Sequence, residues 1–206
     1  MPLIRNVFNT TGSLIMIRPS SIVTNENFMC VTERHPDNYF DLAIIDPPYG
    51  IGASKPSLKN SSVTQKNGSK IRIEQKAYAH KDWDYKIPSP EEIAEIKRVS
   101  KQQIIWGVNY FCSESLRGGR IIWDKLNNET DQFDCEVAYY SGNNRTDLVY
   151  CMWNGMMQGT YCGRDIRKAL VQQGNKQLNE RRIHPTQKPV LLYKWLLINY
   201  GNKGGG

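Results

Sequence analysis

Four short apolar runs, each bounded by turn residues, constrain the fold of this sequence more than any other feature. They span residues 41–46, 103–108, 120–123 and 136–140. The first three are nearly continuous, as is typical of strands covered on both faces in an α/β sheet. Ser89, Pro90 and Glu92 predict a helix start with a capping box, heading a helix to about Ser100. The order strand, loop, helix, strand therefore predicts a doubly wound α/β domain.

The C-terminal part predicts a second helix, opened by Pro189, in which apolar residues recur at helical spacing up to Tyr200. A chain of 206 residues fits one domain. No run approaches the roughly 20 apolar residues that a membrane span needs, so no membrane partner is expected. The five cysteines contain no C-x-x-C pair and the three histidines are scattered, so neither a disulfide framework nor a metal site is expected.

The net charge of +7 is concentrated in two segments. Residues 55–86 hold eight Lys or Arg against three acids, and residues 164–188 hold seven against two. Two basic segments on a mildly acidic body favour a polyanionic partner, although two solvated loops would look the same. Residues 53–70 are rich in Ser, Lys and Asn and contain almost nothing for a core, which predicts a long flexible basic loop.

The most informative residues are Asp46, Pro47, Pro48 and Tyr49, directly after the predicted strand. In open α/β sheets, ligands bind beyond the carboxyl ends of the strands. Two prolines offer no N–H, so this rim presents carbonyl acceptors beside the Asp46 carboxylate. A surface with acceptors and no donors suits a group with two N–H donors, such as the exocyclic amine of a nucleobase. Tyr49 offers a ring on which an extruded base could stack.

From about residue 25 onward, the sequence resembles the S-adenosylmethionine-dependent amino-methylating DNA methyltransferases of the permuted (beta) group found in phages and bacteria. Several blocks carry the resemblance in the family's order. They are residues 36–52 with Asp-Pro-Pro-Tyr, 81–84 (Lys-Asp-Trp-Asp), 103–111 (Gln-Ile-Ile-Trp-Gly-Val-Asn-Tyr-Phe), 122–125 (Ile-Trp-Asp-Lys), 134–136 (Asp-Cys-Glu) and 182–189 (Arg-Ile-His-Pro-Thr-Gln-Lys-Pro).

The resemblance implies a Rossmann-like, circularly permuted methyltransferase fold. It also implies that Asp46–Tyr49 grip the target amine, and that a second motif borders the methionine end of the cofactor. Thr186 stands where an N-cap is expected, and Lys188 beside helix N–H groups would bind the cofactor carboxylate. Asn27 stands where the family usually has a cofactor-side Asp-Cys pair. The cofactor-side residues implied are Asp46, His184, Thr186, Gln187, Lys188 and Asn27.

The family places a glycine-rich cofactor loop after the Lys-Pro helix, where this chain stops at residue 206. We therefore expect residues 1–206 to be one partial catalytic domain, with part of the sheet missing and little S-adenosylmethionine binding. An uncovered sheet edge would favour self-association, for example as a homodimer. Residues 141–182 are expected to hold the target-recognition contacts. The target sequence and any restriction partner are not encoded in a readable way.

The implied function is methyl transfer to adenine N6 in double-stranded DNA, in the cytoplasm of a bacterial or phage-infected cell. Cytosine-N4 methylation and a catalytically silent DNA-binding fragment stay open, while glutamine methylation is disfavoured because such enzymes carry Asn where Asp46 stands. The target base would be flipped out of the duplex. The predicted phosphate contacts lie in the basic loop, at Lys55, Lys59, Lys66 and Lys70.

Overall fold

The computed structural model describes residues 5–8, 14–17, 21–52, 62–64, 70–72, 84–111, 114–127, 133–154, 157–184 and 186–201. The chain divides into two compact units, residues 1–34 and 35–206. In the first unit, β1 (Arg5–Phe8) pairs antiparallel with β2 (Leu14–Ile17). Helix α1 (Phe28–Glu33) follows, and the Asn27 side chain caps it by accepting a hydrogen bond from the Met29 amide at 2.9 Å.

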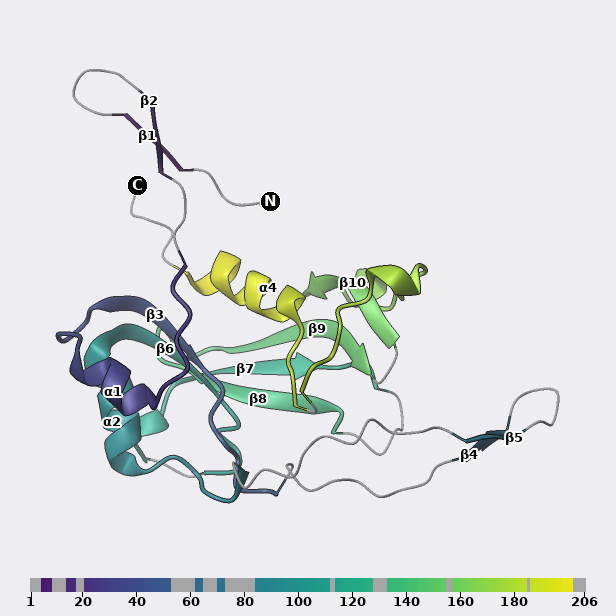
Figure 1. The fold of residues 1–206 in the computed structure, drawn as a ribbon, viewed down its shortest axis with the longest axis horizontal. Helices are drawn as coiled ribbons and strands as arrows, with labels where there is room; N and C mark the ends of the chain where they lie inside the picture. Colours follow the sequence, from purple (N-terminus) through teal and green to yellow (C-terminus); the bar gives the residue numbers. More distant parts are fainter. Residues whose placement is uncertain are drawn as a thin grey trace. The chain divides into compact units, whose positions relative to one another are not determined.

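The second unit is built on a mixed six-stranded sheet with the order β10-β9-β7-β8-β6-β3 (Figure 1). Strands β3 and β6 pair in parallel, as do β7 and β9, and the other neighbours are antiparallel. The elements of this unit are β3 (Phe40–Ile45), β4 (Ser62–Thr64), β5 (Lys70–Arg72), α2 (Pro90–Val99), β6 (Ser100–Trp106), the 3-10 helix η2 (Glu114–Leu116), β7 (Gly119–Asp124), β8 (Cys135–Tyr140), β9 (Thr146–Asn154), β10 (Met157–Gly163), α3 (Ile166–Ala169), the 3-10 helix η3 (Lys176–Leu178) and α4 (Val190–Tyr200).

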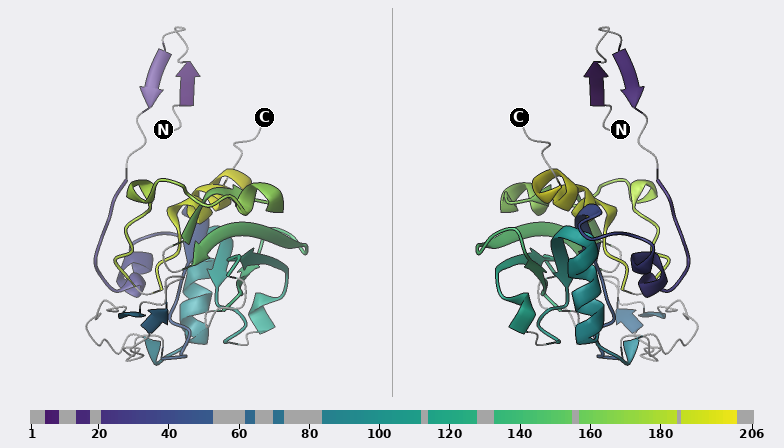
Figure 2. Two further views of the ribbon diagram at one scale, coloured as in Figure 1. Left: turned by 90° about the vertical axis from the view of Figure 1, so that its right-hand side faces the viewer. Right: turned by 90° about the vertical axis from the view of Figure 1, so that its left-hand side faces the viewer.

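Helices α4 and α2 cover opposite faces of this sheet (Figure 2). On one face, Leu192 and Leu196 of α4 pack with Ile104 and Trp106, while on the other Ile93 of α2 packs with Ile105. Successive residues of β6 thus serve the two cores in turn, as the period-2 geometry of a strand requires. All of these side chains are buried, so the apolar run predicted from the sequence is confirmed as an interior strand with two covered faces.

The α/β class and the four predicted strands are confirmed, with shifts of at most three residues at their ends. Helix α2 has the predicted capping box, in which Ser89 accepts from the Glu92 amide at 3.2 Å and Glu92 accepts from the Ser89 amide at 2.8 Å. None of the helices among the described residues combines the length and the apolar character needed to cross a membrane.

Two strands of the main sheet went unpredicted, and both lie in the region assigned to target recognition. β9 and β10 belong to the main sheet, and β9 buries Val149, Cys151 and Trp153. The run Leu148–Trp153 is apolar enough to predict a strand, and the buried Asp147 lies directly before it. Residues 141–182 therefore include part of the scaffold as well as exposed loops.

Two local interpretations change with the structure. Thr186 is not an N-cap, because Pro189 occupies that position without a side-chain cap and α4 begins at Val190. A residue before proline is pushed to extended backbone, so the helix cannot begin at Lys188. In the predicted basic loop, β4 pairs with β5 as a short antiparallel hairpin, and the remainder of residues 53–69 lies outside the described residues.

Candidate functional site

The segment Asp46–Gly50 leaves the carboxyl end of β3, beside the parallel strand β6. The Asp84 carboxylate holds its backbone, accepting hydrogen bonds from the amides of Tyr49 at 2.6 Å and Gly50 at 3.0 Å. Asp84 is only 1% exposed, and a buried carboxylate requires such donors. The sequence places Asp84 in a matching block without a role, and its function as an anchor emerges only from the fold.

The Tyr49 ring contacts two residues of the turn that follows β6. It stacks on Tyr110, with ring centroids 5.1 Å apart and an interplanar angle of 18°. It also passes so close to Gly107 that a Cβ added there would lie 2.1 Å from the ring. One face of Tyr49 is thus covered by Tyr110, and a base could stack on that face only after Tyr110 moves.

Substituting Gly107 should disturb the site directly. Gly107 has a φ of +74°, where an L-residue is strained, and its Cβ would overlap Tyr49. We expect Gly107→Ala to lower the free energy of unfolding by roughly 2 kcal/mol or more, measured by urea denaturation. Gly174→Ala is the matched control, because a Cβ there meets nothing within 4 Å. Equal stabilities of the two variants would contradict this packing.

Four charged side chains and the Tyr49 hydroxyl form one hydrogen-bonded cluster. The Lys188 ammonium lies 2.5 Å from Asp46 Oδ1, 3.0 Å from Glu136 Oε2 and 3.0 Å from the Tyr49 hydroxyl oxygen. Lys125 pairs with Glu136 Oε1 at 2.7 Å. The Tyr49 hydroxyl lies 2.9 Å from Asp46 Oδ1 and 3.1 Å from Glu136 Oε2. These residues follow or belong to four different elements: β3, β7, β8 and the loop before α4.

The cluster balances two carboxylates against two ammonium groups. Burial alone would raise the pKa of Glu136, but Lys188 and Lys125 outweigh it and hold this pKa below its usual value of 4.5. Burial, together with the charges of Glu136 and Asp46, raises the pKa of Tyr49, so its hydroxyl stays protonated. The Lys188 side chain is 3% exposed and that of Asp46 is 32% exposed. Asp46 is therefore the most accessible of the charged groups that meet at Lys188.

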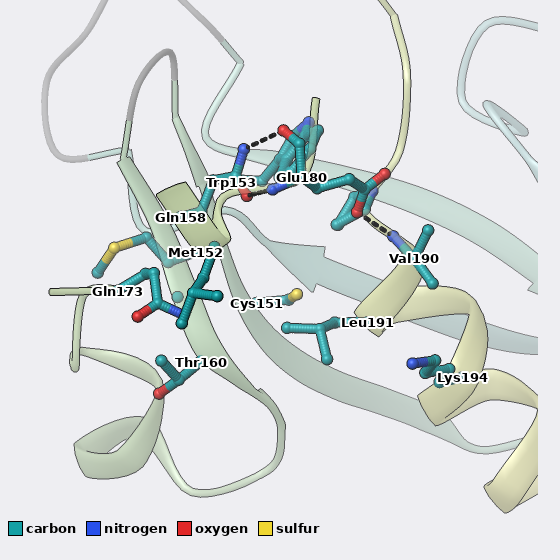
Figure 3. Close-up of a pocket in the computed structure, with 13 residues that line it drawn as sticks. Cys151, Met152, Trp153, Gln158, Thr160, Gln173, Glu180, Val190, Leu191 and Lys194 are labelled. Atoms are coloured by element: carbon teal, nitrogen blue, oxygen red, sulfur yellow. Dashed lines mark hydrogen bonds between the residues drawn. The ribbon is translucent and has the colours of Figure 1, made fainter. Parts of the chain in front are cut away.

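The loop that carries Lys188 is clamped to the sheet by Glu180. Its carboxylate accepts from the Gln187 side chain at 2.6 Å and from the Val190 amide at 2.8 Å. Its backbone exchanges two hydrogen bonds with the Gln158 side chain of β10, at 2.7 and 2.8 Å (Figure 3). Trp153 also donates from Nε1 to the Gln187 carbonyl at 2.8 Å. These hydrogen bonds hold Lys188 against Asp46, and no local sequence pattern predicts them.

A cavity of about 270 Å³ lies on the other side of this clamp, between β9, β10 and the first turns of α4 (Figure 3). Gln158, Glu180, Val190 and Lys194 contribute to its lining. None of the residues predicted for catalysis or cofactor binding lines it. The charged cluster is thus separate from this cavity.

The structure gathers only some of the predicted site residues. Asp46, Tyr49 and Lys188 meet, while the His184 ring nitrogen Nδ1 contacts the Thr186 hydroxyl at 2.9 Å in the adjoining turn. Pro47 and Pro48 are half-buried beside the cluster, and Gln187 is committed to Glu180. Asn27 caps α1 in the N-terminal unit. Lys55, Lys59 and Lys66 lie outside the described residues, and only the backbone of Lys70 is described.

From the sequence, Glu136 and Lys125 had no expected role. Both stand in matching blocks, as the acidic residue of one strand and the lysine after another. A lysine at the end of one apolar run and a glutamate at the start of the next could have indicated an ion pair. That pair forms only because β7 and β8 are neighbours in the sheet.

Comparisons with known proteins leave the family unassigned. The sequence matches no protein-family model, and the search of curated proteins returned no significant match.

The arrangement suits recognition of a group that donates hydrogen bonds. The Asp46 contacts with Lys188 and Tyr49 both fall on Oδ1. An ionised carboxylate has about four acceptor sites, so capacity remains for a ligand. The two prolines that follow add carbonyl acceptors and no N–H donors. Trp106, buried beside Lys188, has no hydrogen-bond partner for its Nε1 within the described part of the chain.

Proposed function

We propose that this protein methylates an exocyclic amine in DNA, with adenine N6 as the target and S-adenosylmethionine as the methyl donor. One observation carries the proposal: a one-third-exposed carboxylate, Asp46, is held at the carboxyl end of β3 by Lys188 and Tyr49 and is followed by two prolines. The mixed sheet is compatible with a Rossmann-like fold, and we extend this to the permuted methyltransferase fold. A DNA substrate would place the protein in the cytoplasm of a bacterial or phage-infected cell.

The chain's own residues would activate the amine by accepting its hydrogen bonds. The lone pair of an aromatic amine is shared with the ring, which makes the nitrogen a poor nucleophile. Acceptance of one N–H by Asp46 and of the other by the Pro47 carbonyl would localise this lone pair. The carboxylate would also stabilise positive charge developing on the nitrogen. Lys188 and Tyr49 hold Asp46 in place, so the acceptor needs no reorganisation when the base arrives.

The described residues fit S-adenosylmethionine only in part. His184 and Thr186 form a turn near the cluster, and Trp106 Nε1 is an unused donor within the described residues. The Lys188 ammonium, however, already contacts Asp46 and Glu136, and the Gln187 side chain already donates to Glu180. When bound, the cofactor would supply the electrophilic methyl group.

The direct test is methyl transfer. Protein expressed from its complete reading frame is incubated with labelled S-adenosylmethionine and unmethylated duplex DNA, and the DNA is digested to nucleosides. Label in N6-methyladenine is the expected result, and label in N4-methylcytosine would redirect the same amine chemistry to cytosine. DNA that binds without acquiring label would overturn the proposal in favour of a silent DNA-binding protein. DNA methylated beforehand on adenine N6 is the control.

The basic loop supplies a second prediction, which concerns the DNA partner. Neutralising Lys55, Lys59, Lys66 and Lys70 together, each to Gln, should weaken binding to all duplex sequences alike. Each lost phosphate contact lowers the salt slope of binding by about 0.9, so the slope should fall by about three to four units. The measurement is a salt titration followed by fluorescence anisotropy.

The matched control neutralises Lys101 and Lys194, two exposed lysines elsewhere in the main unit. We expect this control to change the slope far less per charge removed. If the variant with all four lysines changed to Gln kept the wild-type DNA affinity and salt slope, the basic loop would be a solvated linker. The DNA contacts would then lie in other residues.

A further inference from the structure

Two arginines converge on one buried carboxylate at the start of β9. Arg164 lies 2.8 Å from Asp147 Oδ1, and Arg145 lies 3.6 Å from the same oxygen. The Asp147 side chain is 7% exposed, whereas Arg145 is 71% and Arg164 is 54% exposed. The carboxylate is thus inside the fold, and the two guanidinium groups stand at the surface above it.

Asp147 does not need both arginines. Its Oδ1 accepts a hydrogen bond from Arg164, and its Oδ2 accepts one from the Tyr200 hydroxyl at 2.8 Å. Burial and the neighbouring Asp147 raise the pKa of Tyr200, so this hydroxyl remains a donor. Arg145, at 3.6 Å, is beyond hydrogen-bonding distance. The group formed by Arg145, Arg164 and Asp147 therefore carries an excess positive charge. Each guanidinium has five N–H donors, and the contacts with Asp147 use few of them.

This group lies at the end of the sheet opposite the candidate site. The far end of β9 adjoins that site, since the Trp153 amide donates to the Lys125 carbonyl at 3.2 Å. β9 has nine residues, which at about 3.3 Å per residue separates its ends by roughly 25–30 Å. The basic segment 164–188 is therefore divided: Lys188 serves the candidate site, and Arg164 serves this end.

We propose that Arg145 and Arg164 form a phosphate-binding site, oriented from below by Asp147. Planar guanidinium groups match the geometry of phosphate oxygens and bind them by paired, charge-assisted hydrogen bonds. A buried carboxylate that fixes one arginine and draws the second toward it brings the two forks together before a ligand arrives. The phosphate belongs either to a nucleic-acid backbone or to a small phosphate ester. This site would bind phosphate whether or not the protein transfers methyl groups.

The test compares variants of equal charge in the full chain. Arg145→Gln leaves Asp147 paired with Arg164 and Tyr200, so the fold should be retained; thermal unfolding checks this. Arg167→Gln is the control, because Arg167 is 90% exposed, lies near Arg164 and pairs with Asp165 instead. Affinity for inorganic phosphate is measured by calorimetry at fixed ionic strength, and affinity for a short duplex DNA by anisotropy.

We expect Arg145→Gln to lower phosphate affinity about tenfold and Arg167→Gln to change it less than twofold. Arg145→Lys, which keeps the charge without the fork, should also bind phosphate more weakly than wild type. A parallel loss of duplex affinity identifies the ligand as a nucleic-acid phosphate, and loss for inorganic phosphate alone identifies a small phosphate ester. Equal effects of the two glutamine variants, or no phosphate binding by the wild type, would overturn the site.

Discussion

The Asp46→Ala variant is expected to transfer methyl groups at least about 100-fold more slowly than the wild type, the scale of one lost contact that acts in the transition state. The substitution removes the accessible carboxylate and leaves the Pro47 carbonyl as the remaining acceptor from this segment. Lys188 keeps its contacts with Glu136 and Tyr49, so the cluster should not collapse. DNA affinity should change little, because the proposed phosphate contacts lie elsewhere.

Two companion measurements make this result interpretable. Asp41→Ala removes a carboxylate from the same strand, but Asp41 is half-exposed and pairs with Lys101, so turnover should stay close to the wild-type rate. Single-turnover rates at saturating DNA separate the chemical step from binding. Near-normal turnover in Asp46→Ala would remove this carboxylate from the mechanism, even if the protein proved to be a methyltransferase.

Replacing Lys188 with Met should produce the largest loss of stability. Lys188 is the cation that Asp46 and Glu136 share, and removing one partner from a buried ion pair typically costs about 3–5 kcal/mol. Asp46 is partly exposed, so we expect the lower end, about 3 kcal/mol at pH 7 in urea denaturation. For a chain of this length that corresponds to a melting temperature lower by roughly 6–12 °C.

Lys101→Met is the control for this variant, because the Lys101–Asp41 pair is also a single lysine–carboxylate contact but is exposed at both partners. Exposed pairs contribute little, so its stability should hardly change. If the two methionine variants were equally stable, the contacts of Lys188 would contribute no more to the free energy of unfolding than an exposed ion pair does.

The pH dependence of Lys188→Met follows from Glu136. Its pKa in the folded protein lies below the unfolded value of 4.5, so ionised Glu136 stabilises the fold above pH 4.5, and this contribution is lost as the pH falls through the folded pKa. Protonation of Glu136 also removes a negative charge that Lys188 no longer balances in the variant. The difference in unfolding free energy between wild type and variant should therefore narrow below pH 4.5. A difference that stays constant from pH 7 to pH 3 would contradict this electrostatic origin.

Local signals in the sequence were sufficient for much of the scaffold. The run at 103–108 predicted β6, and Ser89 with Glu92 predicted the start of α2, because strand length, apolar character and capping are properties of adjacent residues. The same kind of signal placed Asp46 at the end of a strand, where a ligand is expected. The run Leu148–Trp153 of β9 carries the same signal, but the buried Asp147 before it is satisfied only by residues distant in the sequence.

The sequence by itself determined the α/β class, most of the sheet strands and the acceptor-rich segment at Asp46. The partners of that segment were decided by the tertiary structure. Lys188 lies 142 residues from Asp46, and from the sequence it was expected at a helix start, binding the carboxylate of the cofactor. The fold places it between Asp46 and Glu136 instead. Pairing between residues so far apart in the sequence depends on the strand order and on the hydrogen bonds of Glu180. A buried charge must be paired, and only the completed fold decides which opposite charge lies close enough to pair with it.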